Sequence, residues 1–96
     1  MNYDKRKVRW TLHALERAAE ANLRTKTLIA SWERAVPQAL SKEQQAYKFK
    51  KYGMESLQNV YFWDEHSQLF FTTSHSEKLN TLLVITVTQG RGNFSV

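Results

Sequence analysis

Three β-prone runs in the second half of the chain constrain the fold more than any other feature of the sequence. They lie at residues 57–64 (LQNVYFWD), 68–73 (QLFFTT) and 81–88 (TLLVITVT), and short polar segments separate them. Aromatic and β-branched side chains favour strands, and short connections favour hairpins. The last run is almost continuously apolar, which predicts a strand in the interior of an antiparallel sheet.

The first third of the chain predicts a short strand followed by two helices. Residues 7–10 (KVRW) alternate polar and apolar side chains, as a strand with one buried face does. Residues 11–24 (TLHALERAAEANLR) are rich in alanine and predict a helix with Thr11 as its N-cap. A second helix is expected from about residue 25, and it must end before Pro37 because the residue preceding a proline disfavours the helical region.

The helix at 11–24 combines an apolar stripe with a polar face. The stripe, which we expect to face the core, consists of Leu12, Leu15 and Ala19. The adjoining polar face consists of His13, Arg17, Glu20 and Arg24. In the second helix, the apolar residues at helical spacing are Leu28, Ile29, Trp32 and Val36. One side of the first helix is therefore expected to hold the domain together, and the other is available for chemistry.

The segment between the helices and the β-prone runs predicts one more strand. Residues 37–45 (PQALSKEQQ) have no clear period and are expected to form a polar connection with at most a helical turn. Residues 46–52 (AYKFKKY) alternate aromatic and basic side chains, which predicts a half-exposed strand that ends at Gly53. The expected fold is α+β: a short strand, two helices, then a three- to four-stranded antiparallel sheet with the helices packed on one face.

Size and composition restrict the class of protein. Ninety-six residues predict a single domain, which we expect to be ordered over about 7–88 with a loose tail at 89–96. The absence of cysteine excludes a disulfide scaffold, a thiolate zinc site and thiol catalysis. No apolar run approaches the roughly 20 residues that cross a bilayer, and the charged N-terminal segment lacks a signal-peptide core. We expect a cytoplasmic protein without a membrane partner, a metal or another cofactor.

The charge distribution favours a polyanionic partner. The net charge is +5, and residues 1–60 hold 12 of the 14 basic side chains but 6 of the 9 acidic ones. Such an excess attracts nucleic acid or an acidic protein by long-range attraction and counterion release. The alternative is that the charge serves solubility alone, as it does in many small basic proteins.

The order of elements and the opening helix resemble a known group of proteins. The stretch HALERAAEANL is similar to the His-Ala-x-x-Arg opening helix of a family of small bacterial and phage proteins related to the RelE/ParE superfamily of toxins and its BrnT-like members. The later YFWD, FFTT and LLVITV strands are similar to that family as well, so that the resemblance covers about residues 7–88. Many relatives carry a second arginine near position 21 or 22, where this chain has Ala21 and Asn22, with Arg24 slightly later.

The resemblance implies a compact RelE-like fold and a function. It implies a metal-independent endoribonuclease, acting as the toxin of a toxin–antitoxin pair on RNA, including RNA at the ribosome, and held inactive by an acidic antitoxin-like protein. Its site would include His13 and Arg17, and also Arg91 in the segment QGRGN, where these toxins often place a catalytic arginine near the C-terminus. The oligomeric state does not follow from the resemblance.

The chemistry of His13 and Arg17 fits that role. In metal-independent RNA cleavage the 2′-hydroxyl attacks the adjacent phosphorus, so that the enzyme moves two protons and stabilises negative charge. Imidazole titrates near neutral pH, and guanidinium binds phosphate oxygens. One helical turn apart, the two side chains can serve one phosphate. The alternative is structural: His13 packs at the start of the helix and Arg17 pairs with a neighbouring carboxylate.

A second group of candidate residues follows in the basic and aromatic segment. Lys48, Lys50 and Lys51 alternate with Tyr47 and other aromatic residues. Lysines that follow the phosphates beside rings that stack on bases are suited to RNA binding. The same alternation also fits an amphipathic strand whose lysine face is solvated. The sequence therefore leaves a second function open, a non-catalytic module on the same fold that binds nucleic acid or protein, and a third, an immunity or antitoxin-like partner.

Overall fold

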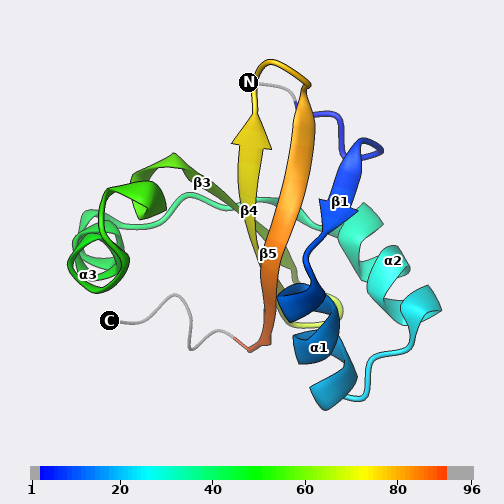
Figure 1. The fold of residues 1–96 in the computed structure, drawn as a ribbon. Coiled ribbons are helices and arrows are strands. Elements are labelled where there is room, and N and C mark those ends of the chain that lie inside the picture. Colours follow the sequence, from blue (N-terminus) through cyan, green and yellow to red (C-terminus); the bar gives the residue numbers. More distant parts are fainter. Residues whose placement is uncertain (1–2, 91–96) are drawn as a thin grey trace.

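A five-stranded sheet with two helices on one face forms the body of the molecule (Figure 1). The structure is a computed structural model and describes residues 3–90. Within these residues the strands are β1 (Val8–Trp10), β2 (Val36–Pro37), β3 (Asn59–Asp64), β4 (Leu69–Ser76) and β5 (Thr81–Gln89). The helices are α1 (Leu12–Glu20), α2 (Thr25–Arg34), α3 (Lys42–Tyr52) and the short 3-10 helix η1 (Met54–Gln58).

The strand order is β1-β5-β4-β3-β2. The pairs β2–β3, β3–β4 and β4–β5 are antiparallel, and the pair β1–β5 is parallel. The α+β class is therefore confirmed, and so is the interior position of β5, which lies between β1 and β4. The two-residue strand β2 was not expected, because Pro37 cannot donate to a sheet and strand patterns do not reveal so short an edge.

Two alanines, and not the leucines, bring α1 against the sheet. Ala14 and Ala18 are 0% and 3% exposed, whereas Leu12 and Leu15 are 72% and 47% exposed. The predicted apolar stripe is therefore wrong, and Ala19 is exposed as well. Since β1 passes into α1 after a single residue, the helix starts close to β5, and only small side chains fit between the two.

The main core lies between these helices and one face of the sheet, which we call the helix face. Trp32 of α2 lies in this core and makes edge-on ring contacts with Trp10, Phe62 and Phe71 at centroid distances of 5.9, 4.9 and 5.3 Å. Other buried members are Ala14, Ala18, Leu28, Ala35, Leu69, Leu82, Val84 and Val87. Of the apolar residues predicted to face the core from the second helix, Leu28 and Trp32 do so, but Ile29 and Val36 are exposed.

A buried carboxylate fastens α2 to the turn between β3 and β4. Asp64 accepts hydrogen bonds from Ser31 Oγ at 2.7 Å, from the Arg34 guanidinium at 3.1 Å and from the His66 backbone N–H at 3.1 Å. Burial would raise the pKa of Asp64, but the hydrogen bonds from Ser31, Arg34 and Ser67 and the charge of Arg34 lower it to about 2. The carboxylate therefore stays ionised inside the protein.

Lys5 ties the N-terminal segment to the same, C-terminal end of α2. Its Nζ donates to the backbone carbonyls of Trp32, Glu33 and Ala35. The ammonium also lies over the Trp32 ring, 4.9 Å from the centroid. Cations at the C-terminal end of a helix stabilise its terminal carbonyls, so this contact holds the chain before β1 in place.

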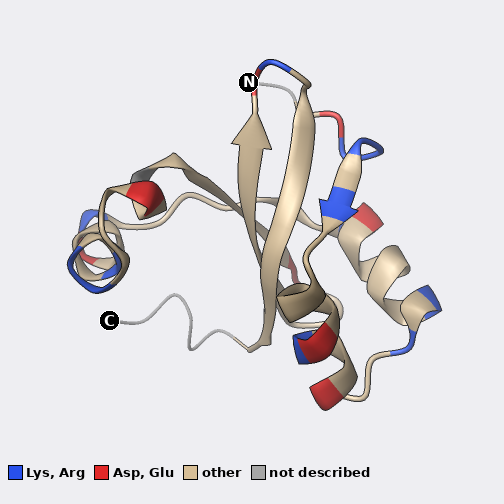
Figure 2. Ribbon diagram, viewed as in Figure 1, with Lys and Arg blue, Asp and Glu red and all other residues tan. Residues whose placement is uncertain are grey.

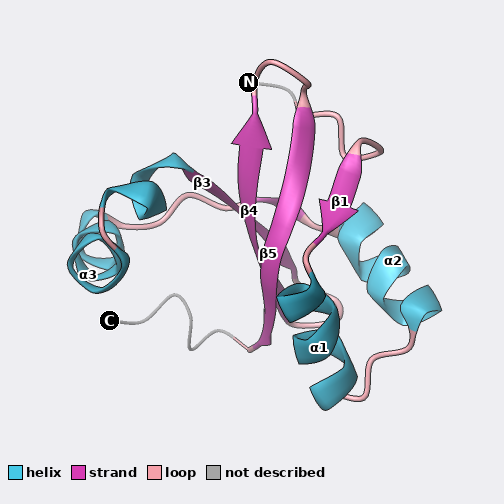
Figure 3. Cartoon of the chain, viewed as in Figure 1, coloured by secondary structure: helices cyan, strands magenta, loops and turns pink. Residues whose placement is uncertain are grey.

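Helix α3 contradicts the strand predicted for residues 46–52 (Figure 3). It begins at Ser41 with a capping box, in which the Ser41 hydroxyl accepts from the Gln44 N–H and the Gln44 side chain accepts from the Ser41 N–H. It ends at Gly53, whose φ of +82° suits glycine. None of its residues is buried, so the alternating pattern reflects side chains around a half-exposed helix rather than a strand.

The opposite face of the sheet, which we call the open face, carries a smaller cluster. Its buried residues are Leu40, Tyr61, Trp63 and Phe70. A bulge in β5 interrupts the register between β4 and β5 at Thr72 and Thr73. The loose tail predicted from residue 89 lies outside the described residues except for its first two positions, and β5 extends to Gln89. Among the described helices, none has the length and apolar character that crossing a bilayer requires.

Candidate functional site

A groove with a volume of about 500 Å³ lies on the open face between α1 and α3. Residues from the beginning, middle and end of the described chain line it, namely His13, Arg17, Lys48, Tyr52, Glu55, Ser56, Asn59, Tyr61, Thr72, Ile85, Thr86 and Thr88. Its floor is made by neighbouring strands, because Tyr61 pairs with Thr72, and Thr72 with Thr86. The groove therefore brings together residues that are far apart in the sequence.

Thr11 fixes the wall of the groove that α1 provides. As N-cap, its hydroxyl oxygen accepts from the Ala14 N–H at 3.0 Å, and the same hydroxyl donates to the carbonyl of Ile85 at 2.9 Å. Ile85 is the extra residue of the β5 bulge, so one side chain joins the start of α1 to this irregular point of the strand. This contact adds to the packing of Ala14 and Ala18 in holding α1 against β5.

His13 and Arg17, the pair predicted from the sequence as candidate site residues, both line the groove from this wall. Both side chains are exposed, and neither is sealed in the core. Arg17 makes an ion pair with Glu20 at 3.5 Å on the surface, with a side chain 43% exposed. Such a pair contributes little and breaks readily, so the guanidinium is available to an anion in the groove.

Lys48 provides the positive charge of the opposite wall. It is half-buried, and its ammonium lies 5.8, 5.6 and 6.0 Å from the ring centroids of Tyr52, Tyr61 and Phe70. The rings hold the ammonium at the edge of the open face by cation–π attraction. Lys48, predicted as a nucleic-acid contact, thus faces the same groove as His13.

The other predicted contacts on α3 do not line the groove. Tyr47, Lys50 and Lys51 are exposed on the outer surface of the helix. A hydrogen bond with Tyr52 raises the pKa of Lys51, whose ammonium lies 5.3 Å from the centre of that ring. The basic surface of α3 therefore continues outward from the groove (Figure 2). Arg91, the remaining predicted residue, lies outside the described residues.

The floor of the groove is uncharged, because β4 and β5 contain no Lys, Arg, Asp or Glu (Figure 2). The polar groups of the floor are instead the hydroxyls of Thr72, Thr86 and Thr88. Sequence reasoning missed these threonines, and also Tyr61 and Glu55. The alternation of side chains along a strand predicts that Tyr61 and Phe62 point to opposite faces of the sheet. Only the strand pairing shows that Thr72 and Thr86 lie beside Tyr61.

No metal-binding cluster is found in the part of the chain that the structure describes, in the sense of three or more His, Asp or Glu side chains close together. Comparisons of this chain with protein-family models, with curated proteins and with solved structures each find no match. Function therefore has to be argued from the geometry of the groove.

Proposed function

We propose that the protein is a metal-independent endoribonuclease that holds single-stranded RNA in the groove between α1 and α3. The observation that carries the proposal is the convergence of His13 and Arg17 from one wall and Lys48 from the other on one open groove. A phosphate between the walls would meet a proton-transfer group and two cations. The acidic antitoxin-like partner belongs to the same proposal, as a protein that covers the groove.

The proposed reaction is an internal transfer at phosphorus. The His13 imidazole takes the proton of the 2′-hydroxyl, and that oxygen forms a bond to phosphorus. The bond from phosphorus to the 5′-oxygen breaks, and the Lys48 ammonium, as the general acid, donates a proton to this leaving oxygen. The products are a 2′,3′-cyclic phosphate and a 5′-hydroxyl, and Arg17 neutralises the developing charge on the phosphoryl oxygens.

The lining of the groove supports RNA as the polyanion. The exposed ring of Tyr52 offers a face on which an unpaired base can stack, and stacking platforms of this kind characterise single-strand binding. The threonine hydroxyls of the floor can donate to and accept from ribose hydroxyls. A groove with charge on its walls and hydroxyls on its floor suits a chain of alternating phosphate and sugar.

The test is cleavage of end-labelled single-stranded RNA by purified protein in EDTA. We expect His13→Ala to slow cleavage by roughly 10²- to 10⁴-fold, the usual contribution of a general acid or base. The matched control is His66→Ala, since His66 is exposed in the turn between β3 and β4 and does not line the groove. If both variants cut RNA equally well, His13 has no part in the reaction and the proposed site is wrong.

The outer surface of α3 favours a second candidate function, a binding module without catalysis. Exposed Tyr47 and Phe49 accompany Lys50 and Lys51 beyond the groove, where they would contact a strand longer than the groove holds. Under this alternative the protein retains RNA in a salt-dependent manner, and the RNA stays intact over the same incubation.

A further inference from the structure

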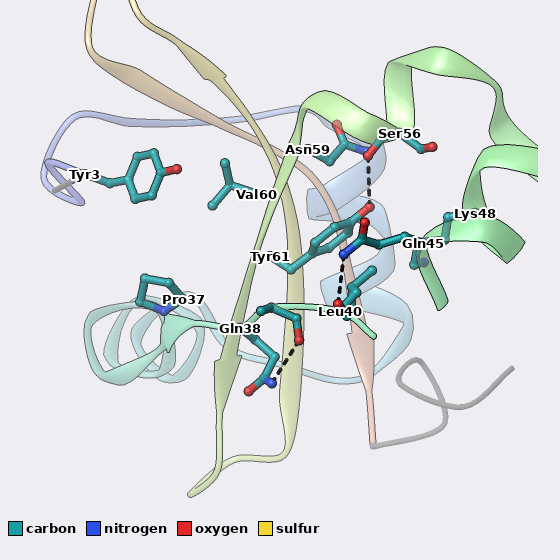
Figure 4. Close-up of a pocket in the computed structure, with 11 residues that line it drawn as sticks. Tyr3, Pro37, Gln38, Leu40, Gln45, Lys48, Ser56, Asn59, Val60 and Tyr61 are labelled. Atoms are coloured by element: carbon teal, nitrogen blue, oxygen red, sulfur yellow. Dashed lines mark hydrogen bonds between the residues drawn. The ribbon is translucent and has the colours of Figure 1, made fainter. Parts of the chain in front are cut away.

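A second hollow opens beside the groove, with a volume of about 440 Å³ (Figure 4). The two spaces are adjacent, because four residues line both of them: Lys48, Ser56, Asn59 and Tyr61. The groove alone would hold the sugar–phosphate backbone of an RNA strand. A hollow next to it, at the Lys48 wall, is placed to receive a group that projects from that backbone.

The hollow exists because β2 accompanies β3 over only part of its length. The two strands pair at Phe62 and Trp63, and the Gln38 N–H then donates to the Tyr61 carbonyl at 2.7 Å. Beyond Gln38 the chain leaves the edge of β3 and turns into α3, which begins at Lys42. The space between this departing segment, η1 and the first half of β3 is the hollow.

Amide side chains give the hollow its chemical character. Gln38 and Gln45 each donate one N–H to a nearby backbone carbonyl, at 3.2 and 2.9 Å, and these contacts orient the two amides. Each amide has a second N–H and a carbonyl oxygen with which it can bind a ligand. Asn59 adds a third amide next to the Tyr61 hydroxyl, which donates to the Ser56 carbonyl (Figure 4). Among the described residues, none that lines the hollow carries a carboxylate.

Two aromatic rings flank these amides. Tyr61 stands in the middle of the hollow and Tyr3 at its far end (Figure 4). Edge-on contacts with Phe62 and His75, at centroid distances of 6.0 and 4.9 Å, hold the Tyr3 ring in place. Tyr61 is buried with its ring stacked on Phe70, so the partly exposed Tyr3 is the ring that can stack on a ligand. An aromatic face together with amides that offer a donor and an acceptor is a means by which proteins bind unstacked bases.

From this arrangement we infer that the hollow binds one base of the RNA, and that the base is adenine. The inference rests on the proposed function, because the groove must hold the strand that carries the base. An amide presents a donor beside an acceptor, which matches the N7 and N6 groups of adenine, whereas guanine presents two acceptors there and is read by Arg or Lys. Of the described residues that line the hollow, Lys48 alone is a cation, and its ammonium lies over the Tyr61 ring.

Binding of hexanucleotides that cannot be cut tests the inference. We compare labelled 2′-deoxy-uridine hexamers that carry one central adenine, guanine, cytosine or uracil, and measure affinity by fluorescence anisotropy. The adenine oligomer should bind at least about fivefold more tightly than the other three. In the double variant Gln38→Ala/Gln45→Ala, whose altered residues line the hollow but not the groove, the preference should fall to less than about twofold. Gln58→Ala is the matched control, since Gln58 is exposed and lines neither space, and it should keep the preference.

The outcomes separate this inference from the function on which it rests. Equal affinity for the four oligomers, together with His13-dependent cleavage of RNA, would overturn the base pocket and leave the nuclease intact. A preference for adenine that survives the double variant would also overturn it. An adenine preference in a protein that never cuts RNA would uphold the pocket and reject the nuclease.

Discussion

Replacing Asp64 by asparagine keeps the shape of the side chain but removes the negative charge that joins α2 to the turn between β3 and β4. The side chain of Asp64 is 3% exposed, and a carboxyl whose pKa falls from its usual 3.8 to about 2 binds protons less tightly in the folded than in the unfolded protein. Folding is then favoured by about 2.5 kcal/mol at pH 7, since a tenfold change in proton affinity corresponds to about 1.36 kcal/mol.

The sign of the pH dependence follows from the direction of this change. A depressed pKa stabilises the protein fully above the unfolded value, and the contribution disappears as the pH falls through 3.8 towards 2. By the same relation, the contribution of Asp64 is about 1.3 kcal/mol at pH 3 and below about 0.5 kcal/mol at pH 2. Asp64→Asn should therefore be much less stable than the wild type at pH 7 and nearly equal to it at pH 2.

Urea unfolding followed by tryptophan fluorescence measures this difference at each pH. At neutral pH the melting temperature of Asp64→Asn should also fall by roughly 10–20 °C for a domain of this size. Glu16→Gln is the matched control, because Glu16 is exposed on α1 and its charge should matter little. If the stability gap between Asp64→Asn and the wild type is the same at pH 7 and pH 2, the charge of Asp64 does not stabilise the fold and our reasoning fails.

Three further substitutions test other contacts. Thr11→Val should destabilise the fold by about 1–2 kcal/mol in urea, because α1 loses its N-cap and the β5 bulge loses a donor, whereas Thr11→Ser should stay within about 0.5 kcal/mol; equal losses would show that the hydroxyl is not responsible. Lys5→Met should cost about 1–2 kcal/mol through the carbonyls left at the end of α2, and Lys7→Met, at an exposed site, should be near neutral, so a silent Lys5→Met would contradict the contact. Lys48→Ala should lower the slope of log affinity for RNA against log salt concentration by about 1, and Lys26→Ala, at an exposed position on α2, should leave this slope unchanged. An unaltered slope in Lys48→Ala would show that Lys48 does not contact an RNA phosphate.

The parts of the fold that the sequence predicts well are those in which local pattern and tertiary environment agree. The run that forms β5 is both β-prone and buried between two strands, so its pattern and its position point to the same structure. Helix α1 was predicted, but not its buried face. Leu12 and Leu15 are exposed because a single residue connects β1 to α1 and brings the helix close to β5. The spacing of apolar residues along the helix does not reveal this tertiary constraint.

Helix α3 was misread for a different reason. Residues 46–50 alternate aromatic and basic side chains over one strand length, and that local period outweighed the helical signal before it. The signal was present: Ser41 and Gln44 have the spacing of a capping box, and the residues after them favour helices. Reading the capping box first would have predicted the helix.

The candidate site was predictable only as separate pieces. The helical spacing of His13 and Arg17 pairs them on one face, and Lys48 stood out by its aromatic neighbours. Their meeting across one groove depends on strand order, since β5 joins α1 on one side and β4 on the other. The threonines of the floor carried no signal, because threonine is an ordinary strand residue and its role follows from its neighbours in the sheet.

The place of β5 in the sheet also determines when the groove can form during synthesis. Among the described residues this strand is the last of the five, yet β1 and α1, which leave the ribosome before it, have it as their partner. Until residues 81–89 emerge, the nascent α1 lacks β5, the strand against which it packs. Such long-range contacts form slowly. Assembly of the groove therefore has to wait until residues 81–89 have been translated.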